Sequence, residues 1–164
     1  VKTNIFNINN TTLINKEIGL FSPFYKENNY LCSDSSKTIS FNTNNEISDL
    51  KDVFNSIIKV LSKDGILIIE DPSLLECLKK TSYDQFYNEH IYVFSTIALK
   101  NLLKKFNLEI FDIENLKTHG GSLRYFIKKK ENKKFKISSK VKKQLQNEIS
   151  YGLDKFKNYK KRSY

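Results

Sequence analysis

The chain contains no methionine and begins with Val1, although a newly translated chain begins with methionine. Its last eight residues stop within a helical pattern, without the cap or turn that usually ends a helix. We therefore expect both ends to be cut, so that these 164 residues are part of a longer protein. No apolar run approaches the roughly 20 residues that span a bilayer. The first ten residues also lack the basic and then apolar order of a signal peptide, so we expect no membrane partner.

Cysteine and proline each occur only twice in this chain, and glycine occurs five times. Cys32 and Cys77 lie far apart and form no CxxC pattern. Isolated cysteines of this kind usually serve as small apolar residues in a core, rather than forming a disulfide or a metal site. The cysteine content therefore predicts a reduced, cytoplasmic setting and no bound metal.

The net charge of +10 is unevenly distributed. Residues 128–164 contain 14 of the 28 basic residues and 3 of the 18 acidic ones, so residues 1–127 are nearly neutral. A basic tail can bind nucleic acid. However, only two of the 28 basic residues are arginine, which is the usual reader of bases and phosphates. We therefore expect no nucleic-acid partner.

Apolar periodicity predicts an α/β fold. Residues 48–61 have a single apolar stripe and should form a helix, followed by a turn at Gly65 and a buried parallel strand over 66–69. With a strand in the region 38–43, this order makes a β-α-β unit. Further elements are expected along the rest of the chain: one or two helical turns over 74–79, a helix over 96–106 capped by Ser95, antiparallel strands over 108–114 and 123–128, and a helix over 138–159.

The aromatic stretch Tyr83–Ser95 is the first candidate for chemistry. It contains His90, one of only two histidines, next to Glu89 and among tyrosines that include Tyr87. A group that titrates near neutrality, a carboxylate that orients it and a phenol that binds oxygen are what proton transfer needs. The alternative is an aromatic loop packed on the core, with His90 as a structural histidine.

A second candidate is the carboxylate pair Glu70 and Asp71, which follows the strand predicted over 66–69. Open α/β sheets bind ligands at the carboxyl ends of their strands, so these side chains could face a cofactor or a substrate hydroxyl. Alternatively, Asp71 and Pro72 begin a turn and Glu70 is solvated. The residues alone leave both interpretations open.

Two motifs together resemble the sugar C-methyltransferase family. They are YNEH at residues 87–90, followed by Phe94 and Ser95, and THGGSLR at residues 118–124. The resemblance covers about residues 49–125 and includes the strand end GILIIEDP. It implies a partial Rossmann-like class I methyltransferase sheet that ends in an antiparallel strand pair and is followed by a carboxyl-terminal helix. It also implies S-adenosyl-L-methionine as cofactor and a nucleotide-linked keto-sugar as substrate, and it leaves the oligomeric state unknown.

The resemblance assigns roles by position in these motifs. Tyr87, Glu89 and His90 match the catalytic residues, and Asn88 replaces the family's usual histidine. The second motif implies substrate binding by His119, Ser122 and Arg124. The candidates for cofactor binding are Asn44, Asn45 and Glu70.

The family's glycine-rich cofactor turn has no counterpart among the chain's five glycines. We therefore expect residues 1–128 to form a partial methyltransferase domain without its amino-terminal cofactor-binding half. Residues 129–164 should form a lysine-rich linker and the start of a truncated helical region. The polypeptide alone should bind the cofactor weakly or not at all. A non-catalytic remnant or binding module of the same fold is the main alternative, and transfer to oxygen or nitrogen also stays open.

Overall fold

A computed structural model describes residues 38–41, 50–82, 92–117 and 120–160. Their strands form one four-stranded sheet in the order β1 (Thr38–Phe41), β2 (Ile66–Pro72), β4 (Ser122–Lys129) and β3 (Leu108–Leu116). β1 and β2 are parallel, whereas β4 is antiparallel to both β2 and β3. The predicted antiparallel pair is confirmed, and its second strand lies inside the sheet rather than at the edge.

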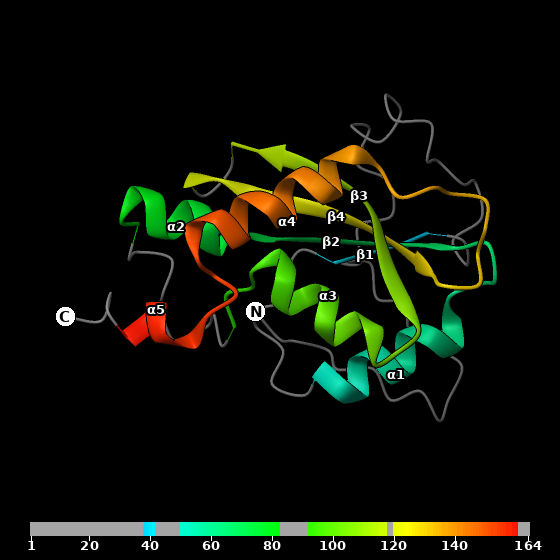
Figure 1. Ribbon diagram of the computed structural model, residues 1–164. Helices are drawn as coiled ribbons and strands as arrows, with labels where there is room; N and C mark the ends of the chain where they lie inside the picture. Colours follow the sequence, from blue (N-terminus) through cyan, green and yellow to red (C-terminus); the bar gives the residue numbers. More distant parts are fainter. Residues whose placement is uncertain (1–37, 42–49, 83–91, 118–119, 161–164) are drawn as a thin grey trace.

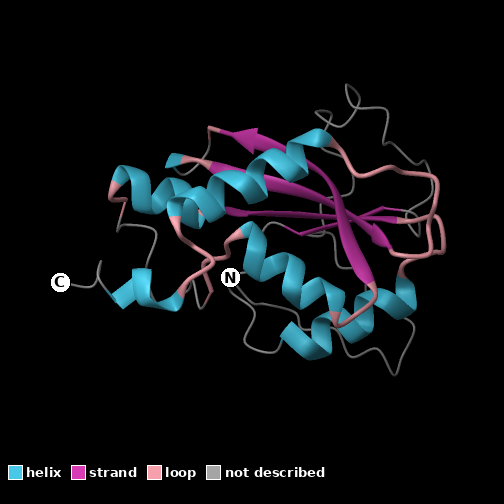
Figure 2. Cartoon of the chain, in the orientation of Figure 1, coloured by secondary structure: helices cyan, strands magenta, loops and turns pink. Residues whose placement is uncertain are grey.

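Five helices accompany the sheet in the described part of the chain. They are α1 (Leu50–Val60), α2 (Leu74–Lys80), α3 (Thr96–Lys104), α4 (Ser139–Tyr151) and α5 (Phe156–Lys160). α1, α3 and α4 cover one face of the sheet, and α2 lies at the carboxyl end of β2 (Figures 1 and 2). The fold is therefore α/β, as predicted. None of the described helices has the length and apolar character that crossing a membrane requires.

The core has one part on each face of the sheet. On the face that carries α1, α3 and α4, which we call the helical face, strand residues such as Leu67, Ile69 and Tyr125 pack against Phe54 and Leu99. The alternate strand residues point to the opposite face. There Ile66, Ile68, Phe111 and Phe126 form a smaller cluster, and Phe135 packs against it. β2 is thus buried on both faces, as its continuous apolar run predicts.

Strand β3 contains an irregularity that its sequence does not reveal. The pairing with β4 passes from Ile110 opposite Ile127 to Asp112 opposite Phe126, so Phe111 has no opposite residue. A bulge adds one residue to a strand and shifts the side chains that follow. The side chains of β3 therefore do not alternate simply between the two faces, since Ile110 and Ile113 both lie on the helical face.

The predicted helix over 138–159 is interrupted. Gly152 takes a φ of 88° and ends α4 in the left-handed conformation that favours glycine. Two large apolar residues of this region lie outside the core: Ile149 is 46% exposed and Phe156 is 76% exposed. Glu148 is buried in their place, while Val141 joins the main core. The domain division after Lys128 stays a prediction.

Other predicted boundaries are close to the observed ones. Ser95 caps α3, because its Oγ accepts a hydrogen bond from the Ala98 N–H at 3.1 Å. This helix ends at Lys104 rather than at residue 106, and Asn107 then takes a φ of 54°. Cys77 is buried, as expected, whereas Cys32 lies outside the described residues.

Candidate functional site

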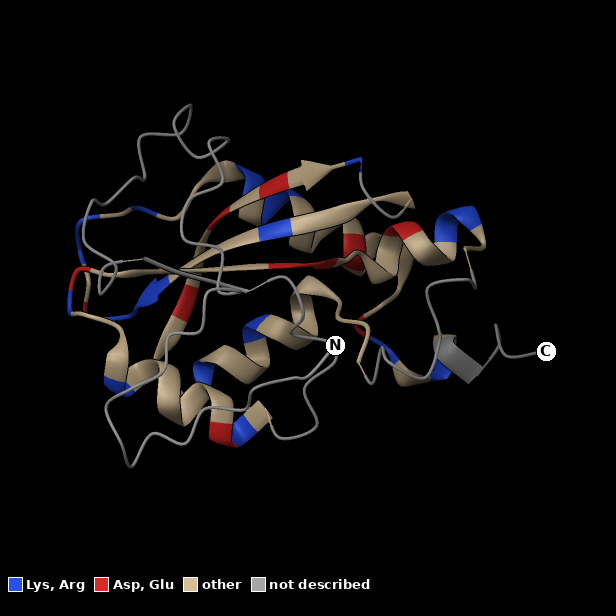
Figure 3. Ribbon diagram, turned by 180° about the vertical axis from the view of Figure 1, so that it is seen from behind, with Lys and Arg blue, Asp and Glu red and all other residues tan. Residues whose placement is uncertain are grey.

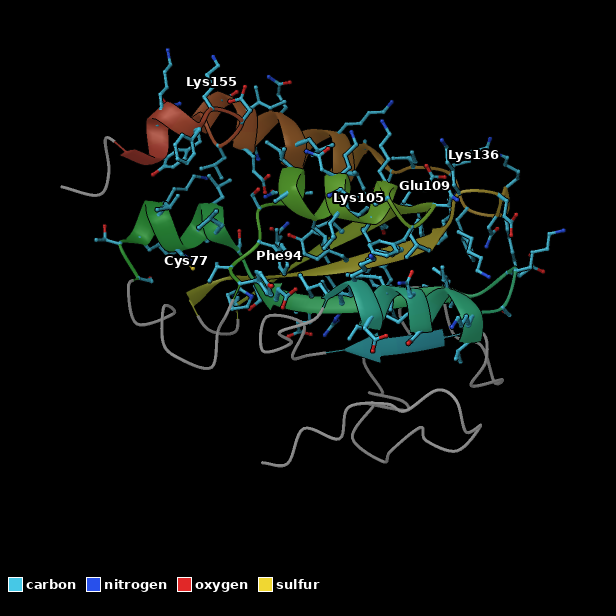
Figure 4. The ribbon with its side chains drawn as sticks, turned by 90° about the horizontal axis from the view of Figure 1, so that it is seen from below. Cys77, Phe94, Lys105, Glu109, Lys136 and Lys155 are labelled. Atoms are coloured by element: carbon cyan, nitrogen blue, oxygen red, sulfur yellow. The ribbon has the colours of Figure 1, made fainter. Side chains whose placement is uncertain are left out.

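Three segments meet at the carboxyl end of β2. The Ser73 N–H, at the junction of β2 and α2, donates to the Gly121 carbonyl at 3.0 Å. The next amide, Leu74 N–H, donates to the Phe94 carbonyl at 3.3 Å. Figure 4 shows Phe94 and Cys77 of α2 near one end of the sheet, away from the end where Glu109 lies. The start of α2, the segment before α3 and the start of β4 are therefore joined at one place.

Most of the residues assigned from the motifs lie outside the described residues. These are Tyr87, Glu89, His90, His119, Asn44 and Asn45. The residues that flank the two motifs are described, however, and they are neighbours. A Cβ added to Gly120, which follows His119, would lie 3.6 Å from Oγ of Ser82, which precedes the aromatic stretch. The residue that precedes the aromatic stretch thus lies beside a glycine of the second motif.

The glycine pair of the second motif is required by its surroundings. Gly120 and Gly121 have φ values of 75° and 131°, which side chains rarely adopt. A Cβ on Gly121 would also stand 3.1 Å from Cβ of Glu76 on α2. Lys80 of the same helix donates from Nζ to the Gly120 carbonyl. The two glycines therefore allow the turn before β4 to pack closely on α2.

Ser122 is buried at the first position of β4. It pairs with Pro72 of β2 and with Leu116 of β3. Strand β2 therefore continues through Asp71 and Pro72, and the alternative in which these residues begin a turn is wrong. Pro72 ends the strand, since Ser73 already caps α2. The role of Ser122 in substrate binding stays a prediction.

Arg124 lies between two carboxylates in neighbouring strands. Its Nη2 is 3.0 Å from Oε2 of Glu70 on β2, and its Nη1 is 2.8 Å from Oε2 of Glu114 on β3. Both glutamates are directly opposite Arg124 in the strand register. Figure 3 shows acidic positions of β2 and β3 on either side of a basic position of β4. Glu70 is thus held by an ion pair rather than simply solvated.

A buried polar cluster lies on the helical face, next to the start of α3. Glu148 of α4 accepts hydrogen bonds from the backbone N–H groups of Thr96 and Ile97, at 2.8 and 2.9 Å. Oγ1 of Thr96 is 3.3 Å from the hydroxyl of Tyr125 on β4. Sequence reasoning missed Glu148. Glu148 does fall at the helical spacing of Val141 and Leu145. However, the neighbouring Ile149 is apolar and was therefore expected to be the buried residue.

Tyr125 remains protonated in this cluster. Complete burial raises the pKa of its phenol above the ordinary value, and the carboxylates of Glu148 and Asp71 raise it further, although the hydrogen bond with Thr96 opposes this. The hydroxyl is therefore a neutral hydrogen-bonding group at physiological pH.

Replacing Tyr125 with Phe is expected to alter how stability depends on pH. An unfolded tyrosine ionises near pH 10, whereas the folded phenol keeps its proton. Between pH 7 and pH 11, the free energy of unfolding should therefore fall by about 1.4 kcal/mol more in the wild type than in the variant. Loss of the hydrogen bond should cost the variant about 1 kcal/mol at pH 7. Urea unfolding of both proteins at the two pH values measures these differences. Equal losses at pH 11 would contradict the assignment.

The described residues contain no group of three His, Cys, Asp or Glu side chains that could hold a metal ion. The histidines of both motifs lie outside the part of the chain that was searched.

Comparison with known proteins identifies two similarities. Residues 117–163 match the family described as C-methyltransferase C-terminal domain. The chain is also 34% identical over 80 residues to C-methyltransferase NovU from Streptomyces niveus. That match covers 49% of this chain and 19% of the relative, so the chain spans only a small part of the relative's length. Residues 117–163 are therefore similar to the C-methyltransferase C-terminal domain family, and part of the chain resembles part of a C-methyltransferase.

Proposed function

We propose that this chain is the carboxyl-side part of an S-adenosyl-L-methionine-dependent C-methyltransferase that acts on a nucleotide-linked keto-sugar. The observation that carries the proposal is that Phe94 and Gly121, one from each motif, accept hydrogen bonds from neighbouring amides at the carboxyl end of β2. Ser82 and Gly120 are neighbours, and Ser73 is hydrogen bonded to Gly121. Open α/β sheets bind their ligands at this edge.

The sheet is consistent with a Rossmann-like class I methyltransferase domain. The parallel pair β1 and β2, with α1 between them in the chain, forms one β-α-β unit. The antiparallel pair of β3 and β4 is the feature that the resemblance implies. We accordingly propose that residues 1–128 belong to a partial domain of this class. We also propose a cytoplasmic location, which rests on the low cysteine content of the sequence.

The proposed chemistry begins with a proton. A carbon next to a carbonyl becomes a nucleophile when a base with a pKa near 7 removes its proton, and we assign this step to His90, oriented by Glu89. The Tyr87 hydroxyl would donate to the enolate oxygen that forms. His119 and Ser122 would contact the sugar substrate. Transfer of the methyl group then depends mainly on positioning.

S-adenosyl-L-methionine would supply the methyl group. Of its candidate ligands, Asn44 and Asn45 lie outside the described residues, and Glu70 is held by Arg124 at 3.0 Å. Because that carboxylate already has a cationic partner, we assign no cofactor contact to Glu70. By the same reasoning, the guanidinium of Arg124 supports this edge of the sheet, and any contact with substrate would be additional to its two ion pairs.

The test uses the natural protein that carries this sequence. It is incubated with S-adenosyl-L-methionine and a panel of nucleotide-diphosphate-linked keto-sugars, and products are identified by mass spectrometry and NMR. We expect a new carbon–methyl bond next to the carbonyl. In D2O without the methyl donor, we expect deuterium to enter the same carbon. Methylation only at oxygen or nitrogen would refute the acceptor class. A lack of both reactions would favour a non-catalytic module.

A further inference from the structure

Glu148 is fully buried, and its carboxylate is used to hold another helix. Its Oε1 accepts from the Thr96 N–H, and its Oε2 accepts from the Ile97 N–H, at 2.8 and 2.9 Å. Nε2 of Gln144 donates to the same Oε1 at 3.1 Å. A buried carboxylate is costly unless hydrogen bonds compensate for its lost hydration. The first turn of α3 provides such donors, because its N–H groups have no partner within the helix.

The segment held in this way leads into the candidate site. The Phe94 carbonyl accepts from Leu74 at the start of α2, and the rings of Tyr92 and Phe94 stack with their centroids 5.6 Å apart. Two residues later, Thr96 is fixed from both sides, by Glu148 of α4 and by Tyr125 of β4. Residues 92–97 are therefore held between α2, α4 and β4.

We propose that Glu148 is a positioning residue, which fixes residues 92–97, the segment that follows the proposed base His90 in the sequence. The inference rests on the proposed function, because it assigns to α4 the support of that same site. Glu148 would contact neither substrate nor cofactor. Glu148 accepts a hydrogen bond from the backbone of Thr96, which lies six residues after His90 in the sequence. Helix α4, within the family match, would thus hold the motif that lies outside the match.

Glu148→Ala removes both acceptors and is expected to loosen the start of α3. Hydrogen exchange measured by mass spectrometry should show that the Thr96 and Ile97 amides exchange at least about tenfold faster, since a fold-change of this size follows the loss of one hydrogen bond. In the methylation assay, kcat should fall about 10- to 100-fold, because small misplacements cost this much, while KM changes less than about threefold.

Two further variants separate positioning from general stability. Glu148→Gln keeps the volume and one acceptor oxygen, so both effects should be intermediate. Ile149→Ala changes the adjacent, half-exposed residue of α4 and should leave exchange and kcat unchanged. If Glu148→Ala does not fold, Gln144→Ala takes its place, because it removes the donor to Oε1 without removing the carboxylate.

The readouts decide the two proposals separately. Unchanged amide exchange at residues 96 and 97 in a folded Glu148 variant would overturn the positioning role. Faster exchange with wild-type kcat would also overturn it, because the loosened segment would then not affect the reaction. A wild-type protein without methyl transfer or deuterium exchange would refute the proposed function. A role for Glu148 in positioning a methyltransferase site would then be refuted as well, and faster amide exchange would show only an anchor of α3.

Discussion

Replacing Arg124 with Ala is expected to lower the free energy of unfolding by about 2–3 kcal/mol. The substitution leaves Glu70 and Glu114 facing each other across β4 with their shared cation removed. Breaking a buried ion pair by removing one partner costs about 3–5 kcal/mol, and we expect less here because Glu114 is partly exposed. Urea unfolding followed by circular dichroism measures the difference.

A variant in which Glu70, Arg124 and Glu114 are all replaced by uncharged residues is the control for the Arg124 prediction. In the triple variant Arg124→Leu, Glu70→Gln and Glu114→Gln, no charge remains to be compensated. A buried ion pair replaced by uncharged groups of similar volume is often neutral in stability, so most of the loss should be recovered. The stability of Arg124→Lys should lie between those of the wild type and Arg124→Ala. Lysine keeps the charge, but it lacks a guanidinium that can pair with both glutamates at once. Equal stability of Arg124→Ala and the wild type would show that the ion pairs of Arg124 with Glu70 and Glu114 do not contribute to the free energy of unfolding.

The sheet and its main helices were predictable because the apolar residues of each element follow a simple period. The run over 66–69 indicated a strand buried on both faces, and the stripe over 48–61 indicated a helix. Both elements are present with small changes at their ends. Ser95 was also predictable, because an N-cap serine satisfies donors within its own helix and needs no distant partner.

Features that depend on distant contacts were not predictable. Glu148 interacts with backbone amides that are 51 and 52 positions away in the sequence. A glutamate in an amphipathic helix is normally placed on the solvated face, whereas here the first turn of α3 makes burial favourable. The bulge at Phe111 is similar, because its cause lies in the pairing with β4.

The contacts at the carboxyl end of β2 were not predictable from the sequence. The strand end at Glu70 and the glycine pair were both identified from sequence, and the structure joins their surroundings through Ser73 and Gly121. The pairing of Glu70 with Arg124 was not foreseen, because it requires β4 to lie beside β2. Two strands separated by about 50 residues can pair in several orders, and the local pattern does not choose among them.

Replacing His90 with Ala is expected to reduce kcat by about 10²- to 10⁴-fold, the range that a general base contributes. In the proposed mechanism the imidazole must be neutral to accept the proton. Activity of the wild type should therefore rise with pH through about 6.5, the ordinary pKa of histidine. The variant should lose this dependence. Initial rates between pH 5 and pH 9 measure both effects, and deuterium exchange without the methyl donor isolates the proton-transfer step.

Comparison with the Glu148 variants makes the His90 result specific. Removing the base should slow deuterium exchange as strongly as it lowers kcat, while the Thr96 and Ile97 amides exchange as in the wild type. Removing the support at Glu148 should do the reverse: the amides exchange faster, while the remaining activity keeps its dependence on pH because the base is still present. Wild-type deuterium exchange in His90→Ala would assign the proton transfer to another group and reopen the interpretation of His90 as a structural histidine.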